Sequence, residues 1–181
     1  MADALELDIK KTALVVIDLQ KGIASRQTVP HPSGAVIANA AKLAAAFRAR
    51  QMPVFLVHVD TQPAERLQTK SDEGWAAPAQ TPPDWSQIVP ELGPQASDIL
   101  ISKKQWGAFY GTDLELQLRR RGIDTIVLCG IATNYGVEST ARFAYEFGFQ
   151  QIFPEDAMSS MSEEAHRLSI AHVLRRIGRV R

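Results

Sequence analysis

The sequence Ala13-Leu-Val-Val-Ile-Asp18 is the stretch on which the predicted fold depends. It is a short, continuous apolar run, rich in β-branched residues, that ends at a carboxylate. Such a run is typical of a strand buried on both faces of a sheet. Four further apolar runs predict strands at 54–57, 99–101, 125–128 and 151–153.

Segments with helical spacing separate these runs. Val36, Ala40, Leu43 and Phe47 recur at steps of four, three and four, so they form one apolar stripe of a helix, with Ser33 as the expected N-cap. The further helix signals are a capping box at 112–115, a stretch over 134–147 that ends before Gly148, and a start at 160–163 followed by an apolar face.

Alternating buried strands and helices predict an α/β fold, namely a doubly wound parallel sheet of five to six strands with helices on both faces, in three layers. The whole chain, 1–181, is expected to be a single domain. The exception to the alternation is 61–97, a long irregular insertion that holds six of the ten prolines. It is interpreted as a surface excursion, or as a lid or subunit contact.

Composition excludes several classes of protein. The chain has 20 basic and 20 acidic side chains, so no basic excess exists to neutralise a phosphate backbone, and nucleic-acid binding is not expected. No apolar stretch approaches the roughly 20 residues that span a bilayer, so no membrane partner is expected. The single cysteine cannot form an internal disulfide, and the N-terminus lacks a secretory signal, which together predict a cytoplasmic protein.

The candidate site follows from the rule that ligands bind beyond the carboxyl ends of parallel strands. Asp18, the run Ser102-Lys103-Lys104 and the loop 130–134 all lie at such ends, and the loop leads into the start of a helix. A carboxylate beside a lysine in a partly dry cleft can act as an acid–base pair, and free backbone N–H groups can hold an anion. The alternative interpretation is an ordinary ion pair at the strand ends.

Three ordered motifs then carry a resemblance to a known family. Val15-Val-Ile-Asp-Leu-Gln20, Lys103-Lys-Gln-Trp-Gly-Ala-Phe109 and Gly130-Ile-Ala-Thr-Asn-Tyr-Gly-Val137 resemble the signature regions of the isochorismatase-like hydrolase superfamily. The similarity extends from about residue 10 to 180. It implies the doubly wound sheet described above, a small-molecule substrate, and a homo-oligomer, either a dimer or a tetramer.

The resemblance also implies the site residues. Many members of the superfamily use an Asp–Lys–Cys triad, whose aspartate matches Asp18 and whose lysine, six residues before Phe109, matches Lys103; the position of the nucleophilic cysteine is occupied by Gly136. A non-proline cis peptide is expected at Ile131–Ala132. The implied substrate-binding residues are Gln20, Trp106, Phe109, Ile131, Ala132, Thr133 and Tyr135. At least one of Trp75, Trp85 and Trp106 is expected to line the cleft or to be buried by another subunit.

The missing thiol leaves three hypotheses. Isochorismatases proper resemble this chain in having glycine at that position, and their vinyl-ether hydrolysis needs a general acid rather than a nucleophile. The leading hypothesis is therefore a hydrolase of a small carboxylate or amide-like metabolite in which Asp18 handles the proton. The second is a non-catalytic descendant that binds such a molecule. The third is an amidase that uses Cys129, although a cysteine inside a strand is expected to be an inert core residue.

No cofactor is expected. His58 and Asp60 can share one face after the second strand, but no further histidine follows at a ligand-like interval. His31, His166 and His172 are interpreted as strand-end or surface residues. The sequence contains neither a dinucleotide-binding fingerprint nor a phosphate-binding glycine loop.

Overall fold

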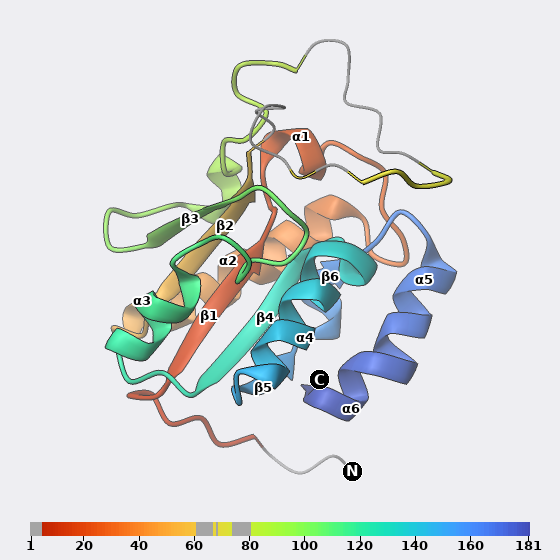
Figure 1. Cartoon of the computed structure of the whole chain (residues 1–181). Coiled ribbons are helices and arrows are strands. Elements are labelled where there is room, and N and C mark those ends of the chain that lie inside the picture. The colour runs from red at the N-terminus through yellow and green to blue at the C-terminus, as the bar shows by residue number, and fades with distance from the viewer. Residues whose placement is uncertain (1–4, 61–66, 68, 74–80) are drawn as a thin grey trace.

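The structure is a computed structural model that describes residues 5–60, 67, 69–73 and 81–181. Its centre is a sheet of parallel strands in the order β3-β2-β1-β4-β5-β7, with β6 beside the end of β4 (Figure 1). Within the described residues the strands are β1 (Thr12–Ile17), β2 (Val54–Val59), β3 (Ile99–Lys103), β4 (Thr125–Ile131), β5 (Gln150–Phe153), β6 (Met158–Ser159) and β7 (Arg179–Val180).

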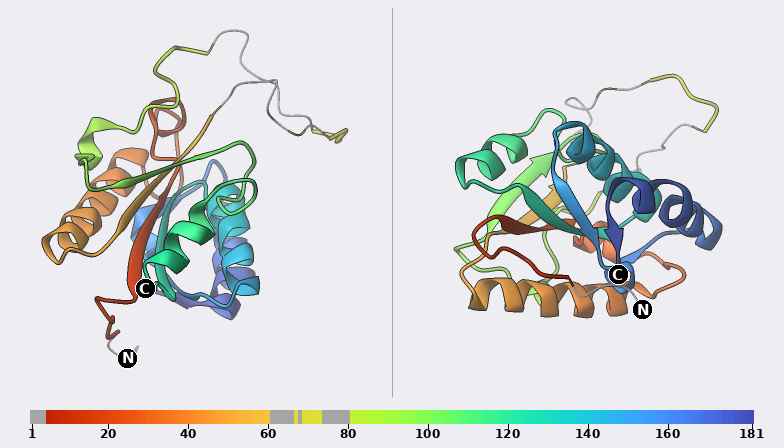
Figure 2. Two further views of the ribbon diagram at one scale, coloured as in Figure 1. Left: turned by 60° about the vertical axis from the view of Figure 1, so that its left-hand side comes forward. Right: turned by 90° about the horizontal axis from the view of Figure 1, so that it is seen from below.

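Helices cover both faces of this sheet. One face carries α2, and the other carries α3, α4 and the C-terminal helical segment (Figure 2). The α-helices are α1 (Lys21–Ala24), α2 (Ser33–Ala49), α3 (Leu114–Arg120), α4 (Glu138–Glu146), α5 (Glu163–Leu168) and α6 (Arg175–Ile177). Two 3₁₀ turns, η2 (Pro90–Leu92) and η4 (Glu155–Ala157), and two π-helical turns, η3 (Thr133–Val137) and η5 (Ser169–Leu174), complete the described elements.

The predicted α/β fold with a parallel sheet between helices is confirmed, and the five apolar runs all form strands. The predicted number of strands, five to six, is wrong, because the sheet has seven in the part of the chain that the structure describes. The additional strands β6 and β7 have two residues each, and a segment that short has no readable periodicity.

Two helix starts differ from the prediction. Ser33 is the first residue of α2 rather than its N-cap, and the N-cap is Pro32, which has no side-chain oxygen to offer. The capping box at 112–115 does not form, because the N-cap of α3 is Asp113. The hydroxyl of Thr112 accepts a hydrogen bond from the Leu114 amide at 3.1 Å instead.

The described part of the insertion packs against the strand ends. Trp85 is buried, and a bridge joins Ile88 to Gln20, which lies just beyond β1. The Lys21 amide donates to the Gln87 carbonyl at 2.9 Å. Residues 81–92 are therefore a wall of the protein at the carboxyl edge of the sheet. Trp75 lies outside the described residues.

The strand β1 is buried along its whole length. All six of its residues are buried, and they pair in register with β2 on one side and β4 on the other. None of the helices formed by the described residues has the length and apolar character needed to cross a membrane.

The close approach of β4 to β1 predicts a strong effect of substitution at Gly130. Gly130 pairs with Ile17, and its φ is +124°, where a Cβ atom would lie 2.0 Å from the Ile17 carbonyl oxygen. We expect Gly130→Ala to lower the free energy of unfolding by about 3 kcal/mol, because it combines backbone strain with a clash inside the sheet.

Gly34→Ala is the matched control for that substitution. Nothing lies within 4 Å of the Cβ position at Gly34, which is in α2. We expect it to leave the free energy of unfolding unchanged or to raise it by up to about 1 kcal/mol, since alanine favours helix over glycine. Urea denaturation measures both values. Equal stability of the two variants would contradict the predicted constraint.

Candidate active site

A buried ion pair lies at the carboxyl edge of the sheet. Asp18 directly follows β1, and Lys103 is the last residue of β3, so the two side chains meet across the end of β2. Lys103 Nζ lies 2.8 Å from Asp18 Oδ2, and both residues are almost fully buried. Lys103 Nζ also donates to the Gln105 carbonyl oxygen at 3.2 Å. Asp18 Oδ1 is buried and has no hydrogen-bond partner among the described residues.

The turn after β4 brings Gly136 against this pair. The peptide Ile131–Ala132 is cis, as the resemblance predicts, and the π-helical turn η3 follows it. A Cβ atom at Gly136 would lie 3.0 Å from Asp18 Oδ2 and 2.9 Å from Ile17 Cγ2. The three residues predicted to be catalytic, Asp18, Lys103 and Gly136, therefore lie together.

A cavity of about 370 Å³ opens onto these three residues. Of the predicted substrate-binding residues it is lined by Trp106, Ile131, Ala132 and Tyr135. The prediction that a tryptophan lines the cleft is confirmed twice, since Trp85 and Trp106 both do so. The Trp106 and Tyr135 rings pack edge to face with centroids 4.9 Å apart, so they form a single aromatic wall.

Three predicted binding residues do not line the cavity. Gln20 is buried, and its side chain amide bonds to both the N–H and the C=O of Val59, at 2.8 and 3.0 Å, so it joins two walls of the cavity. Phe109 packs instead against Phe149, with ring centroids 5.8 Å apart. Thr133 is fully buried, and its hydroxyl contacts the His166 ring.

Several lining residues were missed by the sequence analysis. They are Ile23, Arg26, Val59, Glu73, Gln105 and Met161. A weak signal existed for Arg26, because it lies eight residues beyond Asp18 in the connection that follows the first strand. Met161 and Glu73 reach the cavity only through the tertiary fold, so the sequence contains no spacing that marks them.

The environment of Asp18 favours its protonated form. Burial is the largest influence and raises the pKa of the Asp18 carboxyl, whereas the charge and hydrogen bond of Lys103 act in the opposite direction without overcoming it. A carboxyl group that retains its proton more strongly than in water, and that faces a cavity, can serve as a general acid.

Cys129 takes no part in this arrangement. It is fully buried in β4, and burial raises the pKa of its thiol to about 12. Because the thiolate is the nucleophilic form, such a thiol is chemically inert. The expectation that Cys129 is a core residue is confirmed.

The histidines differ from the prediction at one position. His166 was expected at a strand end or on the surface, but it is 1% exposed, and its Nδ1 lies 2.8 Å from Thr133 Oγ1. Helix α5 places it against η3, a contact that its own sequence neighbours do not reveal. Among the described residues no three histidine, cysteine, aspartate or glutamate side chains are grouped so that they could hold a metal ion.

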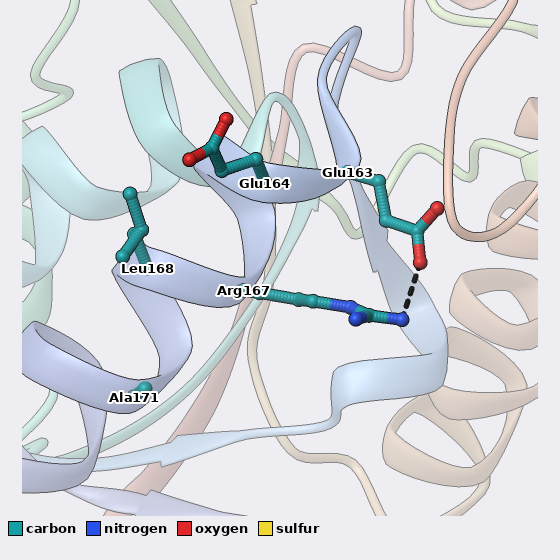
Figure 3. A pocket seen from close by; sticks show the side chains of 5 residues that line it. All are labelled: Glu163, Glu164, Arg167, Leu168 and Ala171. Carbon is teal, nitrogen blue, oxygen red and sulfur yellow. Dashed lines mark hydrogen bonds and ion pairs between the residues drawn. The ribbon is translucent and has the colours of Figure 1, made fainter.

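A second hollow lies on the outer surface of α5 (Figure 3). The five residues that line it are all exposed, and Glu163 and Arg167 form an ion pair at 2.5 Å. The remaining lining residues are Glu164, Leu168 and Ala171. None of these side chains is a buried titratable group, so the candidate chemistry belongs to the cavity at Asp18.

The fold and the site define the class of protein: a parallel α/β protein with a buried acid–base pair where its strands end. The family model for the isochorismatase domain matches residues 12–181, and the chain belongs to the isochorismatase family.

Similar proteins support this membership. The chain is 57% identical over 180 residues to the isochorismatase family protein YecD of Escherichia coli O157:H7, covering 98% of this chain and 95% of that protein. The structure of an isochorismatase family protein from Burkholderia thailandensis is 48% identical, with a TM-score of 0.90 and coverage of 94% and 90%. At 29% identity over 197 residues, covering 94% and 76%, the chain is similar to the ureidoacrylate amidohydrolase RutB of Methylobacterium radiotolerans, which is a hydrolase.

The opposing influences on Asp18 predict how its titration responds to substitution. We expect the Asp18 carboxyl to titrate above 3.8, and Lys103→Met to raise its pKa further by removing the charge that lowers it. The carboxyl binds its proton more tightly in the folded than in the unfolded chain. Its contribution to the free energy of unfolding is therefore full below the unfolded pKa and is lost as the pH rises through the folded pKa.

Carboxyl ¹³C NMR of labelled aspartate measures this titration directly. Lys104→Met is the control, because Lys104 pairs with Asp60 at 2.8 Å rather than with Asp18. A lower Asp18 pKa in the Lys103→Met protein, or equal shifts in both variants, would contradict the electrostatic interpretation.

The burial of Cys129 predicts resistance to alkylation. We expect iodoacetamide to leave the folded protein unmodified at neutral pH, because the thiol is inaccessible and its pKa is raised to about 12. The same reagent should add one carbamidomethyl group in guanidinium chloride. Intact-protein mass spectrometry follows both reactions, and rapid modification of the folded protein would show that Cys129 is reactive.

Proposed function

We propose that this chain is a hydrolase that acts on a small carboxylate or amide-like metabolite without a covalent thiol intermediate. In this proposal Asp18 is the acid and base, Lys103 provides electrostatic stabilisation, and backbone amides near Gly136 bind the substrate. The observation that carries it is the buried Asp18 carboxyl, whose pKa is raised by burial and whose Oδ2 atom faces the space beside Gly136. The absence of a side chain at Gly136 leaves that oxygen accessible to a substrate.

Hydrolysis of a vinyl ether is a reaction that this set of residues can carry out. The Asp18 carboxylic acid would donate its proton to the methylene carbon of the enol ether, which leaves an oxocarbenium ion beside the Asp18 carboxylate. A water molecule then adds to that ion, and its released proton returns to Asp18. In the collapse of the resulting hemiketal the bond to the ether oxygen breaks and the hydroxyl proton passes to that oxygen, which yields a keto acid and an alcohol. No side-chain nucleophile takes part.

Arg26 is the residue that supports a substrate carrying a carboxylate, because the acidic residues that line the cavity, Asp18 and Glu73, balance the basic ones in number. The Lys103 ammonium lies 2.8 Å from Asp18 Oδ2, so its charge is directed at that carboxyl group whether or not the group carries its proton. Arg26 also lines the cavity, and no other described residue pairs with its guanidinium. A guanidinium binds a carboxylate in a bidentate manner, so Arg26 is the proposed anchor for the substrate's anionic group. Trp85, Trp106 and Tyr135 provide an apolar wall for the remainder of the molecule.

The site disfavours the thiol-dependent chemistry of the family's amidases. The resemblance aligns Gly136 with the nucleophilic cysteine, and Cys129 is inert in the core. Of the backbone amides near Gly136, those of Tyr135 and Val137 already donate to the Ala132 carbonyl. Fewer backbone N–H groups of this turn are therefore available to a substrate than the sequence predicts.

We further propose a cytoplasmic homo-oligomer, a dimer or tetramer. A free cysteine in the core fits a reducing compartment. Phe143, Phe147 and Leu168 expose apolar surface on the helical face, which a second subunit could cover.

Substitution of Asp18 tests the proposed chemistry. We expect the protein to hydrolyse isochorismate and expect Asp18→Asn to reduce kcat by about 10²–10⁴-fold, because the amide keeps the shape of the side chain and cannot donate its proton. Asp60→Asn is the matched control, since it removes a carboxylate at the same edge of the sheet that pairs with Lys104. Release of pyruvate measures both rates.

Absence of hydrolysis would decide between an enzyme and a binding protein. If the purified protein hydrolyses neither isochorismate nor any member of a panel of nicotinamide, carbamoyl and enol-ether compounds, and yet binds one of them tightly by calorimetry, the chain is a binding protein and not an enzyme. Full activity of Asp18→Asn would remove Asp18 from the mechanism.

A further inference from the structure

His166 is a buried titratable residue that the proposed chemistry does not use. It lies in α5, is 1% exposed, and packs where three separate parts of the chain meet. Its Nδ1 contacts Thr133 in η3, its Nε2 lies 3.8 Å from the Glu155 carboxylate in η4, and the ring of His31 meets its own ring edge-on at 6.2 Å. A buried imidazole in such a position requires a physical explanation.

The two contacts of the Thr133 hydroxyl assign the proton of the His166 ring to Nδ1, because both contacts are hydrogen bonds only in that tautomer. The Thr133 hydroxyl donates its only proton to the Ser159 carbonyl at 3.1 Å, so it can only accept at its 2.8 Å contact with His166 Nδ1. Nδ1 is therefore protonated. In the neutral ring Nε2 is then an acceptor, and it is buried without a hydrogen-bond partner among the described residues.

The surroundings keep this imidazole neutral. Burial is the largest influence and lowers the pKa of His166, and the proximity of His31 acts in the same direction. Glu155 and Glu163 oppose this effect without reversing it. The Nδ1–H tautomer of a neutral ring is consequently the form present at neutral pH.

Thr133 links this ring to the catalytic edge. Thr133 is fully buried, follows the Ile131–Ala132 cis peptide by one residue, and precedes Gly136 by three. Its hydroxyl is tied to β6 on one side and to α5 on the other. Within the same turn, Tyr135 packs on Trp106 at the cavity. A shift of Thr133 would therefore move both the aromatic wall and the backbone beside Asp18.

We infer that His166 is a positioning residue for the site, whose Nδ1–H holds Thr133 and through it the turn from Ala132 to Gly136. The inference rests on the proposed function for its effect on turnover. The tautomer and the placement of the turn are independent of any substrate.

Two amide substitutions distinguish a role of the Nδ1–H hydrogen bond in positioning Thr133 from a role of the ring in filling space. The amide nitrogen of asparagine can occupy the place of Nδ1 and donate to Thr133, whereas the amide of glutamine reaches the place of Nε2. We expect His166→Asn to retain the kcat for isochorismate and the near-ultraviolet circular dichroism of the Trp106–Tyr135 pair. We expect His166→Gln to change that spectrum and to lower kcat by about 10²-fold with little change in KM, because the reacting groups are misplaced while binding is kept.

Two controls complete the experiment. His172→Gln removes an exposed imidazole from η5, the turn that directly follows α5, and should change neither measurement. In the unsubstituted protein, ¹⁵N NMR of labelled histidine should show that the His166 ring has a protonated Nδ1 and an unprotonated Nε2.

The outcomes separate this inference from the proposed function. If the unsubstituted protein turns over no substrate, the proposed function fails, while the tautomer and the dichroism still decide the role of His166. An Nε2–H tautomer would overturn the inference. So would a His166→Gln protein with an unchanged spectrum, or a His166→Asn protein as impaired as His166→Gln in both kcat and spectrum.

Discussion

The contact between Asp18 Oδ2 and Lys103 Nζ is the interaction around which the rest of the site is organised. Removing two charges from water is costly, and their attraction offsets this cost only when the geometry is good and further hydrogen bonds are made. The fold satisfies that requirement by ending β1 and β3 at the same level, so that the lysine reaches both Asp18 and the Gln105 carbonyl. The other carboxyl oxygen, Oδ1, is buried and has no hydrogen-bond partner among the described residues. It is Oδ2, beside Gly136, that lies toward the space a substrate would occupy.

Close backbone approach makes this arrangement possible. Gly130 lets β4 lie against Ile17 where a side chain would collide with a carbonyl, and Gly136 lets the following turn reach the carboxylate itself. Beyond them Gln20 ties β2 to the segment that carries Trp85, so the cavity walls are held by backbone-directed hydrogen bonds. The site is thus built from strand ends and turns whose positions are fixed by the sheet.

Much of this could be predicted from the sequence because the strands are uniformly apolar. The run 13–17 is apolar at every position, so it is stable as a strand that is covered on both faces of the sheet. The residue that follows it must therefore lie at the edge of the sheet where the strands end. The same reasoning placed the run 102–104 and the loop 130–134 at that edge, and the resemblance singled out Lys103 and Gly136. Phe109 was wrongly expected to bind the substrate, because the motif around it gives the order of residues along the chain and not the direction in which a side chain points. Met161 and Glu73 were missed because each reaches the cavity through the tertiary fold, and His166 was wrongly placed because its burial depends on its contact with Thr133. The two-residue strands β6 and β7 are too short to have a pattern.

The narrow space around Gly136 also limits which residues this position accepts. A Cβ atom there would lie 2.9 Å from Ile17 Cγ2, a side chain of the fully buried strand β1. Any residue larger than glycine at position 136 therefore requires the Ile17 side chain to shift. The range of residues that position 136 accepts thus depends on the side chain at position 17.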